Sequence, residues 1–114
     1  MKRFLTLAAA GLCLAMASTL AAAEEKMTHV QLAKLFPGQF DAVVRGSVKV
    51  SFTAKGNGVL IGQMPGRKDQ GRWSLQNGKL CIMLTNWTSG KSTCSTVVAD
   101  GGWYRGHGVK FRKL

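Results

Sequence analysis

The sequence has few acidic residues, few histidines and few prolines. It contains 5 Asp and Glu against 16 Lys and Arg, with 2 His and 2 Pro among 114 residues. The scarcity of titratable acids and bases argues against general acid–base catalysis. The length leaves room for one domain and excludes a two-domain enzyme with a separate cofactor-binding half. A hydrophobic fraction of 46% in turn argues against a disordered chain.

The N-terminal segment has the three regions of a secretory signal peptide. Met1-Lys2-Arg3 is cationic, the run from Phe4 to Leu20 is apolar, and Ala21-Ala22-Ala23 offers small residues to a signal peptidase. Cleavage is therefore expected near Ala23-Glu24, which divides the chain into a signal peptide (1–23) and a single exported domain (24–114). The mature protein is expected to be periplasmic or secreted.

Two alternatives for this segment are weaker. A membrane-spanning helix needs about 20 strongly apolar residues, whereas this run is rich in Ala, Ser and Thr and ends in a cleavage site. A lipid anchor on Cys13 would need a small residue before the cysteine, and Leu12 stands there. No second apolar run follows that is long enough to cross a bilayer as a helix.

The positive charge persists after processing. Removal of residues 1–23 takes away only Lys2 and Arg3, so the net charge falls from +11 to +9 while 91 residues remain. The basic character is therefore a property of the folded domain.

Two cysteines, Cys81 and Cys94, remain after processing. In an exported chain they are most simply interpreted as one disulfide. Pairing them centres a hairpin between Trp87 and Thr88, within a polar loop, so the bridge would join neighbouring strands. A reactive thiol is the alternative; a zinc site is a poor match, because zinc takes four ligands. We expect no metal and no cofactor.

The residue pattern predicts a mainly β fold after one short helix. Thr28 and Gln31 form a capping box for a helix over 29–36, and residues 47–54 alternate strictly between polar and apolar. Asn57-Gly58 and Asn77-Gly78 are typical of hairpin turns. The expected architecture is an antiparallel meander of about seven short strands, forming a sandwich or small barrel. Other strands are expected over 59–64, 72–76, 80–85, 93–98, 103–105 and 109–112, with a longer polar loop over 65–71.

The order of motifs resembles a family of small exported proteobacterial proteins known only as a domain of unknown function. The motifs that carry the resemblance are Gly71-Arg72-Trp73, Lys79-Leu80-Cys81, Cys94, Gly102-Trp103-Tyr104 and Val109-Lys110-Phe111. The chain departs from the family by lacking an aromatic-rich first strand near Val43-Val44. The resemblance implies an exported β domain with one disulfide, and it implies no established activity.

The sequence does not point to an enzyme. Asp69 and Asp100 fall in predicted turns, where Asp is favoured for backbone hydrogen bonds. His107 lies between two glycines and is expected to be a turn residue, because no nucleophile-elbow sequence accompanies it. Gly56-Asn57-Gly58 lacks the strand-to-helix context of a phosphate-binding loop.

Basic residues interleaved with aromatic residues are the most distinctive feature of the mature chain. Such a surface attracts polyanions. Trp87, at the predicted tip of the disulfide-anchored hairpin, is the tryptophan expected to contact a ligand, whereas Trp73 and Trp103 are expected in the core. The candidate binding residues are Arg67, Lys68, Arg72, Trp87, Arg105, Lys110 and Arg112.

The function expected from this surface is non-catalytic binding of an anionic envelope component, such as lipopolysaccharide or anionic lipid. The alternative is a protein-partner module, an inhibitor or stabiliser of an exported protein, in which the charge serves only solubility. Nucleic-acid binding would suit the charge and the aromatic residues but conflicts with export.

Overall fold

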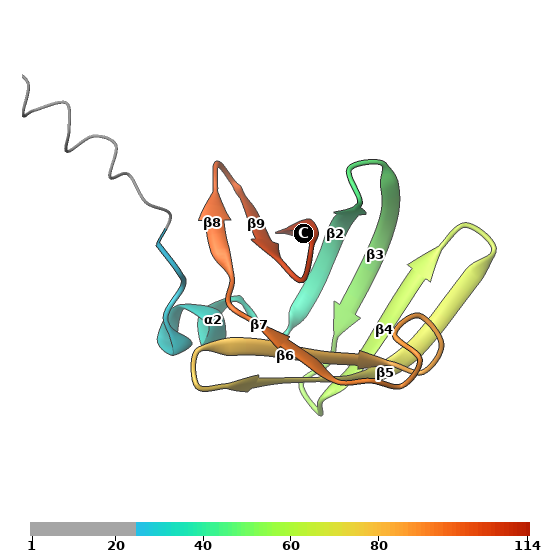
Figure 1. The fold of residues 1–114 in the computed structure, drawn as a ribbon, viewed down its shortest axis with the longest axis horizontal. Helices are drawn as coiled ribbons and strands as arrows, with labels where there is room; N and C mark the ends of the chain where they lie inside the picture. The colour runs from blue at the N-terminus through green and yellow to red at the C-terminus, as the bar shows by residue number, and fades with distance from the viewer. Residues whose placement is uncertain (1–24) are drawn as a thin grey trace, which may run out of the picture.

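The computed structural model describes residues 25–114, so the predicted signal peptide lies outside the described residues. One helix precedes a single nine-stranded sheet in the order β7-β6-β5-β4-β3-β2-β10-β9-β8, and every pairing is antiparallel (Figure 1). The elements are α2 (His29–Leu35), β2 (Gly38–Val44), β3 (Val48–Ala54), β4 (Val59–Met64), β5 (Arg67–Gln76), β6 (Lys79–Leu84), β7 (Thr93–Ser95), β8 (Val98–Asp100), β9 (Trp103–Gly106) and β10 (Val109–Lys113).

The predicted mainly β class is confirmed, with nine strands in place of about seven. One additional strand is β2, which had no assignment of its own in the sequence. The other arises because the strand expected over 93–98 is divided into β7 and β8 by Thr96 and Val97. The sheet curls into a half-barrel, and the β2–β3, β4–β5 and β8–β9 hairpins rise from a base formed by β5, β6 and β7 (Figure 1).

The helix forms as its capping box predicts. The Gln31 backbone N–H donates to Thr28 Oγ1 at 3.2 Å, and the Thr28 backbone N–H donates to Gln31 Oε1 at 2.9 Å. Leu32 and Leu35 are buried, so the helix closes one end of the half-barrel with its apolar side. It ends one residue earlier than expected, with Phe36 as the C-cap before Pro37.

The alternating segment 47–54 gives strand β3, in register with β2. Phe40 lies opposite Phe52, and Ala42 lies opposite Val50. These side chains point to the inner face, where Phe40 and Ala42 are buried. Because alternate residues of a strand face opposite sides, Lys49 and Ser51 point outward.

The prediction of a polar loop over 65–71 is wrong. Only Pro65 and Gly66 form a turn, and β5 begins at Arg67. The first part of β5, as far as Arg72, pairs with β4, and the part from Gly71 to Gln76 pairs with β6. A Cβ at Gly71 would overlap the carbonyl of Met83, so the absence of a side chain allows the strands to approach closely where the sheet turns its corner.

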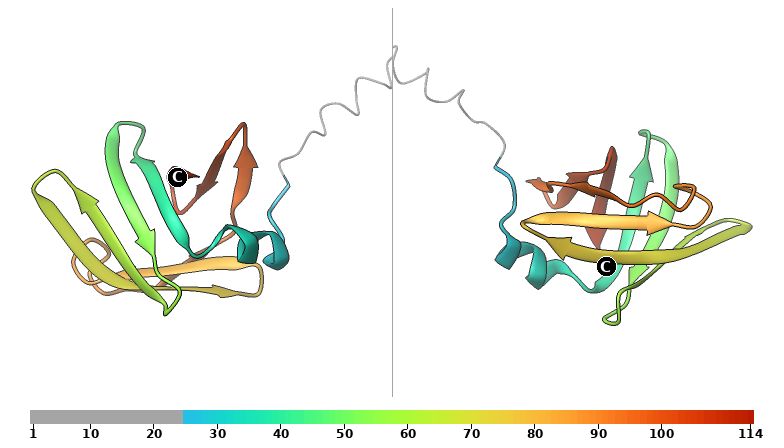
Figure 2. Two further views of the ribbon diagram at one scale, coloured as in Figure 1. Left: turned by 180° about the vertical axis from the view of Figure 1, so that it is seen from behind. Right: turned by 60° about the horizontal axis from the view of Figure 1, so that its bottom comes forward.

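The two edge strands of the sheet, β7 and β8, are consecutive in the chain. Thr96 and Val97 alone connect them, and Val97 is completely buried. The N-terminal segment adds to this seam: the backbone N–H of Met27 donates to the Val97 carbonyl at 2.7 Å, and Lys26 forms an isolated bridge with Val98. Figure 2 shows the curled sheet from behind and from below.

The predicted disulfide is confirmed. Cys81 and Cys94 lie directly opposite each other in β6 and β7, and their sulfurs are 2.05 Å apart. The bridge therefore encloses the loop between the two strands.

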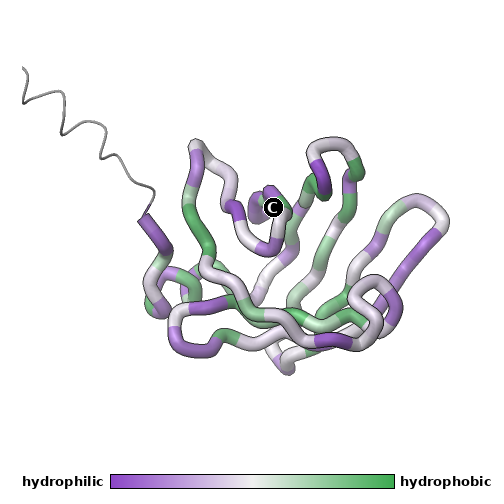
Figure 3. Tube along the Cα trace, in the orientation of Figure 1, coloured by the Kyte–Doolittle hydropathy of each residue, from purple (hydrophilic) through white to green (hydrophobic). Residues whose placement is uncertain are grey.

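The core fills the inner face of the half-barrel. Phe36 stacks on Phe40 with ring centroids 4.7 Å apart, and Phe111 meets Phe40 edge-on at 5.7 Å. Hydrophobic segments gather near the base, while hydrophilic residues mark the β4–β5 hairpin and the β5–β6 turn (Figure 3). Each of the three rings is at most 7% exposed, so the aromatic cluster supplies much of the burial that stabilises this small domain.

Candidate functional site

Trp103 lies on the outer face of the sheet. Its strand neighbour Tyr104 points inward and packs against Phe111, with ring centroids 5.7 Å apart. Alternation along β9 therefore turns Trp103 outward, where it is half-buried. The expectation that Trp103 belongs to the core is thus wrong: on this edge of the sheet the inner positions are already filled by Tyr104 and Phe111.

Two cations from β10 cover the Trp103 ring. Lys110 Nζ lies 5.1 Å from the ring centroid, and the Arg112 guanidinium carbon lies 4.8 Å from it. Lys110 and Arg112 are two residues apart on one strand, so they share the outer face. Each cation–π contact is worth about 0.5–1 kcal/mol at an exposed site.

Further charges surround this pair. Arg105 lies opposite Lys110, Lys110 lies opposite Val43, and Val43 lies opposite Lys49, so three cations share one row of the outer face. Two carboxylates accompany them: Asp100 accepts from Arg105 Nε at 3.0 Å, and Asp41 lies 3.9 Å from Arg112. We define the Trp103 face as Lys49, Trp103, Arg105, Lys110 and Arg112, which carries four cations.

Two hollows adjoin the Trp103 face, and both include Trp103 and Val43 in their walls. One, of about 650 Å³, extends over the β9–β10 turn to Gly46 and Gly108. The other, of about 810 Å³, extends toward β4 and the Pro65-Gly66 turn. The indole therefore stands between two depressions, with cations beside it in both.

The structure separates the residues predicted to bind. Arg105, Lys110 and Arg112 belong to the Trp103 face. Lys68 points to the same side but, at about 4.8 Å per strand, lies about 19 Å from Arg112 along its row; that row runs through Arg112, Asp41, Ser51, Gln63 and Lys68.

The remaining predicted cations lie elsewhere. Arg72 is at the bend of β5, where its guanidinium lies close to Gly58. Alternation places Arg67 on the inner side with Asp69. Lys49, in contrast, was not among the predicted residues, although its outward position could have been found from the alternation of segment 47–54.

Trp87 lies on the opposite side of the sheet from Trp103. Its ring meets Phe52 edge-on at 6.4 Å and covers Gly62, where a Cβ would collide with the indole. The expectation of an indole presented at a hairpin tip is therefore wrong, because the 85–92 loop folds over the inner face of the half-barrel. The missing side chain at Gly62 provides the space that Trp87 occupies.

Asp69 holds this loop in place. One of its oxygens, Oδ2, accepts from the backbone N–H groups of Trp87 at 2.7 Å and Asn86 at 2.9 Å. The other, Oδ1, accepts from the Gln70 backbone at 2.9 Å and the Asn86 amide at 3.1 Å. Asp69 is only 4% exposed. The sequence had predicted a turn at Asp69. The partners of its carboxylate lie 17 and 18 residues away, so the local sequence does not reveal them.

The hydrogen bonds keep Asp69 ionised despite its burial. Desolvation raises the pKa of a buried carboxyl group, but the N–H donors of Trp87, Asn86 and Gln70 outweigh it, so the pKa of Asp69 lies below its ordinary value. A carboxylate whose oxygens accept four hydrogen bonds is well suited to organising a loop.

His107 lies in the β9–β10 turn, as predicted, with a positive φ of 58°. Its Nε2 is 2.8 Å from the Leu80 carbonyl, its Nδ1 is 3.3 Å from Thr93 Oγ1, and its backbone N–H donates to Ser95 Oγ at 3.3 Å. Burial lowers the pKa of His107 and outweighs the opposing effect of the Leu80 carbonyl. The neutral ring therefore connects the turn to β6 and β7 across the open side of the sheet.

Comparisons with known proteins gave no further indication: no family model, no curated protein and no solved structure matches the chain. The resemblance of its motifs to an exported domain family thus stays a prediction. Among residues 25–114, no cluster of three or more His, Cys, Asp or Glu side chains is placed to hold a metal ion. None of the helices in this range is long and apolar enough to span a membrane.

Proposed function

We propose that the protein is a non-catalytic binding module for an anionic component of the cell envelope, bound at the Trp103 face. The observation that carries this proposal is the pair of cations, Lys110 and Arg112, held over one outward-facing indole. An indole that packs on neighbouring cations restrains their charged groups over one part of the surface, and both Lys110 and Arg112 are exposed there.

Charge supports an anionic ligand. The Trp103 face and its two ion-pair partners, Asp41 and Asp100, carry four positive and two negative charges. The mature domain carries +9 overall. A surface with this excess attracts phosphate or carboxylate groups at long range, and the attraction weakens as salt rises.

The arrangement of acids and bases supports binding without catalysis. Asp69 is saturated by hydrogen bonds, Asp41 and Asp100 are paired with arginines, and both ring nitrogens of His107 have protein partners. Each of these four groups is thus engaged by partners within the protein.

Export supports an envelope ligand. The disulfide between Cys81 and Cys94 is suited to an oxidising compartment, which agrees with the signal peptide predicted from the sequence. We therefore propose that the mature protein acts in the periplasm or outside the cell, where lipopolysaccharide and anionic phospholipids are the main polyanions.

Vesicle binding tests the proposal. The purified protein is mixed with phosphatidylglycerol-containing vesicles, with phosphatidylcholine vesicles and with lipopolysaccharide, at low salt and in about 1 M salt, where the Debye length falls to about 3 Å. We expect retention on the two anionic surfaces at low salt only. Equal retention on neutral and anionic vesicles would overturn the proposal.

A charge-reversal pair localises the site. Lys110→Glu is expected to abolish most of the anionic retention, whereas Lys79→Glu, an exposed change of the same charge on β6, is expected to reduce it only slightly. Equal losses in the two variants would show that net charge, and not the Trp103 face, carries the binding. A salt-insensitive complex with an envelope protein would favour the protein-partner alternative.

A further inference from the structure

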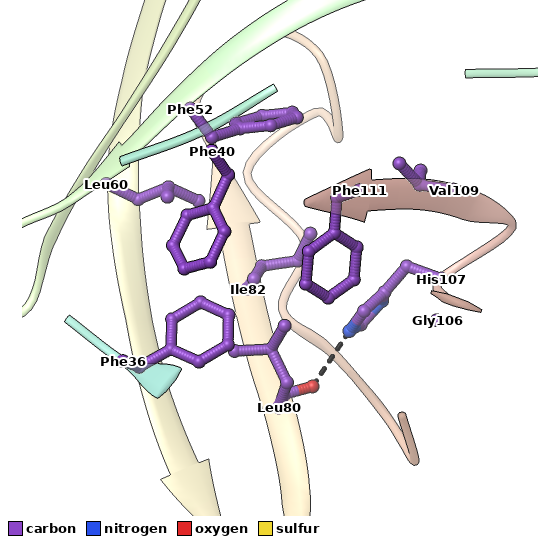
Figure 4. Close-up of a pocket in the computed structure, with 10 residues that line it drawn as sticks. All are labelled: Phe36, Phe40, Phe52, Leu60, Leu80, Ile82, Gly106, His107, Val109 and Phe111. Atoms are coloured by element: carbon purple, nitrogen blue, oxygen red, sulfur yellow. Dashed lines mark hydrogen bonds between the residues drawn. The ribbon is translucent and has the colours of Figure 1, made fainter. Parts of the chain in front are cut away.

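The half-barrel encloses an apolar cavity that none of the functions considered above uses. It has a volume of about 60 Å³. Rings from Phe36, Phe40 and Phe111 surround it, with Leu80 and Ile82 on the opposite wall (Figure 4). The exposed surface of the cavity is entirely apolar. Apolar cavities accept apolar ligands.

The size of the cavity limits what can enter. The volume of the cavity is about five times the volume that one water-sized sphere requires. This matches the end of an alkyl chain and excludes a whole lipid tail. The rest of a longer chain would have to lie against apolar surface outside the cavity.

A row of valines provides that surface. Val109 lies opposite Val44, and Val44 lies opposite Val48, across β10, β2 and β3 on the inner face. Val109 lines the cavity, and Val48 at the other end of the row is 40% exposed. The β3–β4 ladder begins only at Ser51, so the part of β3 that carries Val48 has no β4 partner. The valine row therefore leads from solvent to the cavity.

The cavity and the Trp103 face share a wall. The β9–β10 turn contributes Gly106, His107 and Val109 both to the cavity and to the hollow that contains Trp103, Arg105 and Lys110. Val109 and Lys110 are neighbours on one strand and point to opposite faces. Among residues 25–114, no carboxylate lines either space. Only the thickness of one strand and turn separates an apolar cavity from a cationic surface.

From this juxtaposition we infer that the anionic ligand is an amphiphile, a phosphate bearing an alkyl chain, whose chain end occupies the cavity. The chain leaves the cavity past Val109 and Val44, and the phosphate reaches over the rim between Gly46 and Gly108 to Lys110 on the outer face. This inference rests on the proposed function, because it takes the Trp103 face as the site of the anionic group.

Three small ligands distinguish the contribution of the alkyl chain to binding from that of the phosphate group. The disulfide-bonded protein is titrated with hexyl phosphate, inorganic phosphate and hexan-1-ol, and amide and methyl NMR shifts report the affinity and the location. We expect hexyl phosphate to bind at least about tenfold more tightly than inorganic phosphate, because burial of about two methylenes is enough for this ratio. The shifts should include Ile82 and Val109 as well as Lys110.

Variants on the two sides of the wall complete the test. Ile82→Phe fills the cavity and is expected to remove the advantage of hexyl phosphate while leaving inorganic phosphate unaffected; Leu60→Phe, from a different wall, provides an independent second case if the first fails to fold. Lys110→Glu should weaken both phosphates and leave hexan-1-ol unchanged.

Failure of this inference is distinguishable from failure of the proposed function. Equal affinity for hexyl phosphate and inorganic phosphate, with anionic vesicles still retained, overturns the amphiphile and preserves the binding module. Hexan-1-ol binding as tightly as hexyl phosphate also overturns it, because the phosphate would then contribute nothing. Loss of all anionic binding, vesicles included, rejects the proposed function itself.

Discussion

Trp87 and Trp103 lie on opposite faces of one sheet and are held by different interactions. Trp87 covers Gly62 on the inner face, in a loop that the buried Asp69 carboxylate fixes through backbone N–H groups. Trp103 lies on the outer face under Lys110 and Arg112. The inner tryptophan is part of the packing, whereas the outer one organises a surface. Changes on the inner face should therefore cost stability, and changes on the outer face should mainly cost binding.

Loss of the disulfide should produce the largest loss of stability. Replacing both Cys81 and Cys94 with Ser is expected to lower the free energy of unfolding by about 3 kcal/mol, because the bridge closes a loop with a sequence separation of 13. Urea unfolding followed by tryptophan fluorescence measures this change. An unchanged midpoint would show that the 85–92 loop is held without the bridge.

Asp69→Asn should produce the next largest loss of stability. The Asn side chain has one acceptor oxygen in place of two. Its NH2 group is a donor, so wherever that group faces the N–H groups of Asn86 and Trp87, two donors oppose each other. We expect the melting temperature to fall by roughly 5 °C or more. Asp100→Asn, at an exposed position beside the Trp103 face, is the matched control and should melt close to the unaltered protein. Similar melting of both variants would contradict the structural task assigned to Asp69.

Acidification should destabilise the protein through His107, with a smaller effect. Because the folded-state pKa of His107 is below its ordinary value of 6.5, the unfolded chain takes up a proton first as the pH falls. Stability is thus fully present above about pH 6.5, declines below it and levels off beneath the folded-state pKa. Thermal melts of the unaltered protein and of His107→Asn, which tolerates the positive φ, should show a weaker pH dependence in the variant.

Trp103→Ala should have the smallest effect on stability and a clear one on binding. We expect the free energy of unfolding to fall by about 1 kcal/mol, since the ring makes two cation–π contacts that are each worth only about 0.5–1 kcal/mol at an exposed site. Retention on anionic vesicles should fall roughly fivefold, because the two cations lose the ring that orders them. A large loss of stability without a change in retention would place Trp103 with Trp87 as a packing residue.

Local patterns predicted the local parts of this fold. The Thr28–Gln31 capping box, the alternation of 47–54 and the Asn-Gly turns each depend on a few adjacent residues, and each is present. The pairing of Cys81 with Cys94 followed from a short hairpin and is also confirmed. Interactions within a turn or a hairpin can be deduced from spacing, because the chain between the partners is short.

Contacts between distant strands were not predictable in the same way. Asp69 belongs to β5, where it pairs with Gly62, and residues 86 and 87 satisfy its carboxylate; nothing in the sequence around it indicates those partners. The predictions for Trp87 and Trp103 were wrong for the same reason. Trp87 lies on the inner face because Gly62 makes space for it, and Trp103 lies on the outer face because Tyr104 takes the inner position beside it. Hydropathy alone cannot decide which face of a strand is the inner one.

The two-residue connection between β7 and β8 imposes the curvature of the whole sheet. The edge strands of a flat sheet with this order would lie about 38 Å apart at about 4.8 Å per strand. The chain from Ser95 to Val98 can span only about 11 Å, so the sheet has to roll up before both ends can pair. Cleavage of the backbone between Thr96 and Val97 would release this tether, and the edges would become free to take on strands from other molecules. This two-residue link thus protects the exposed backbone edges of β7 and β8 from pairing with other molecules.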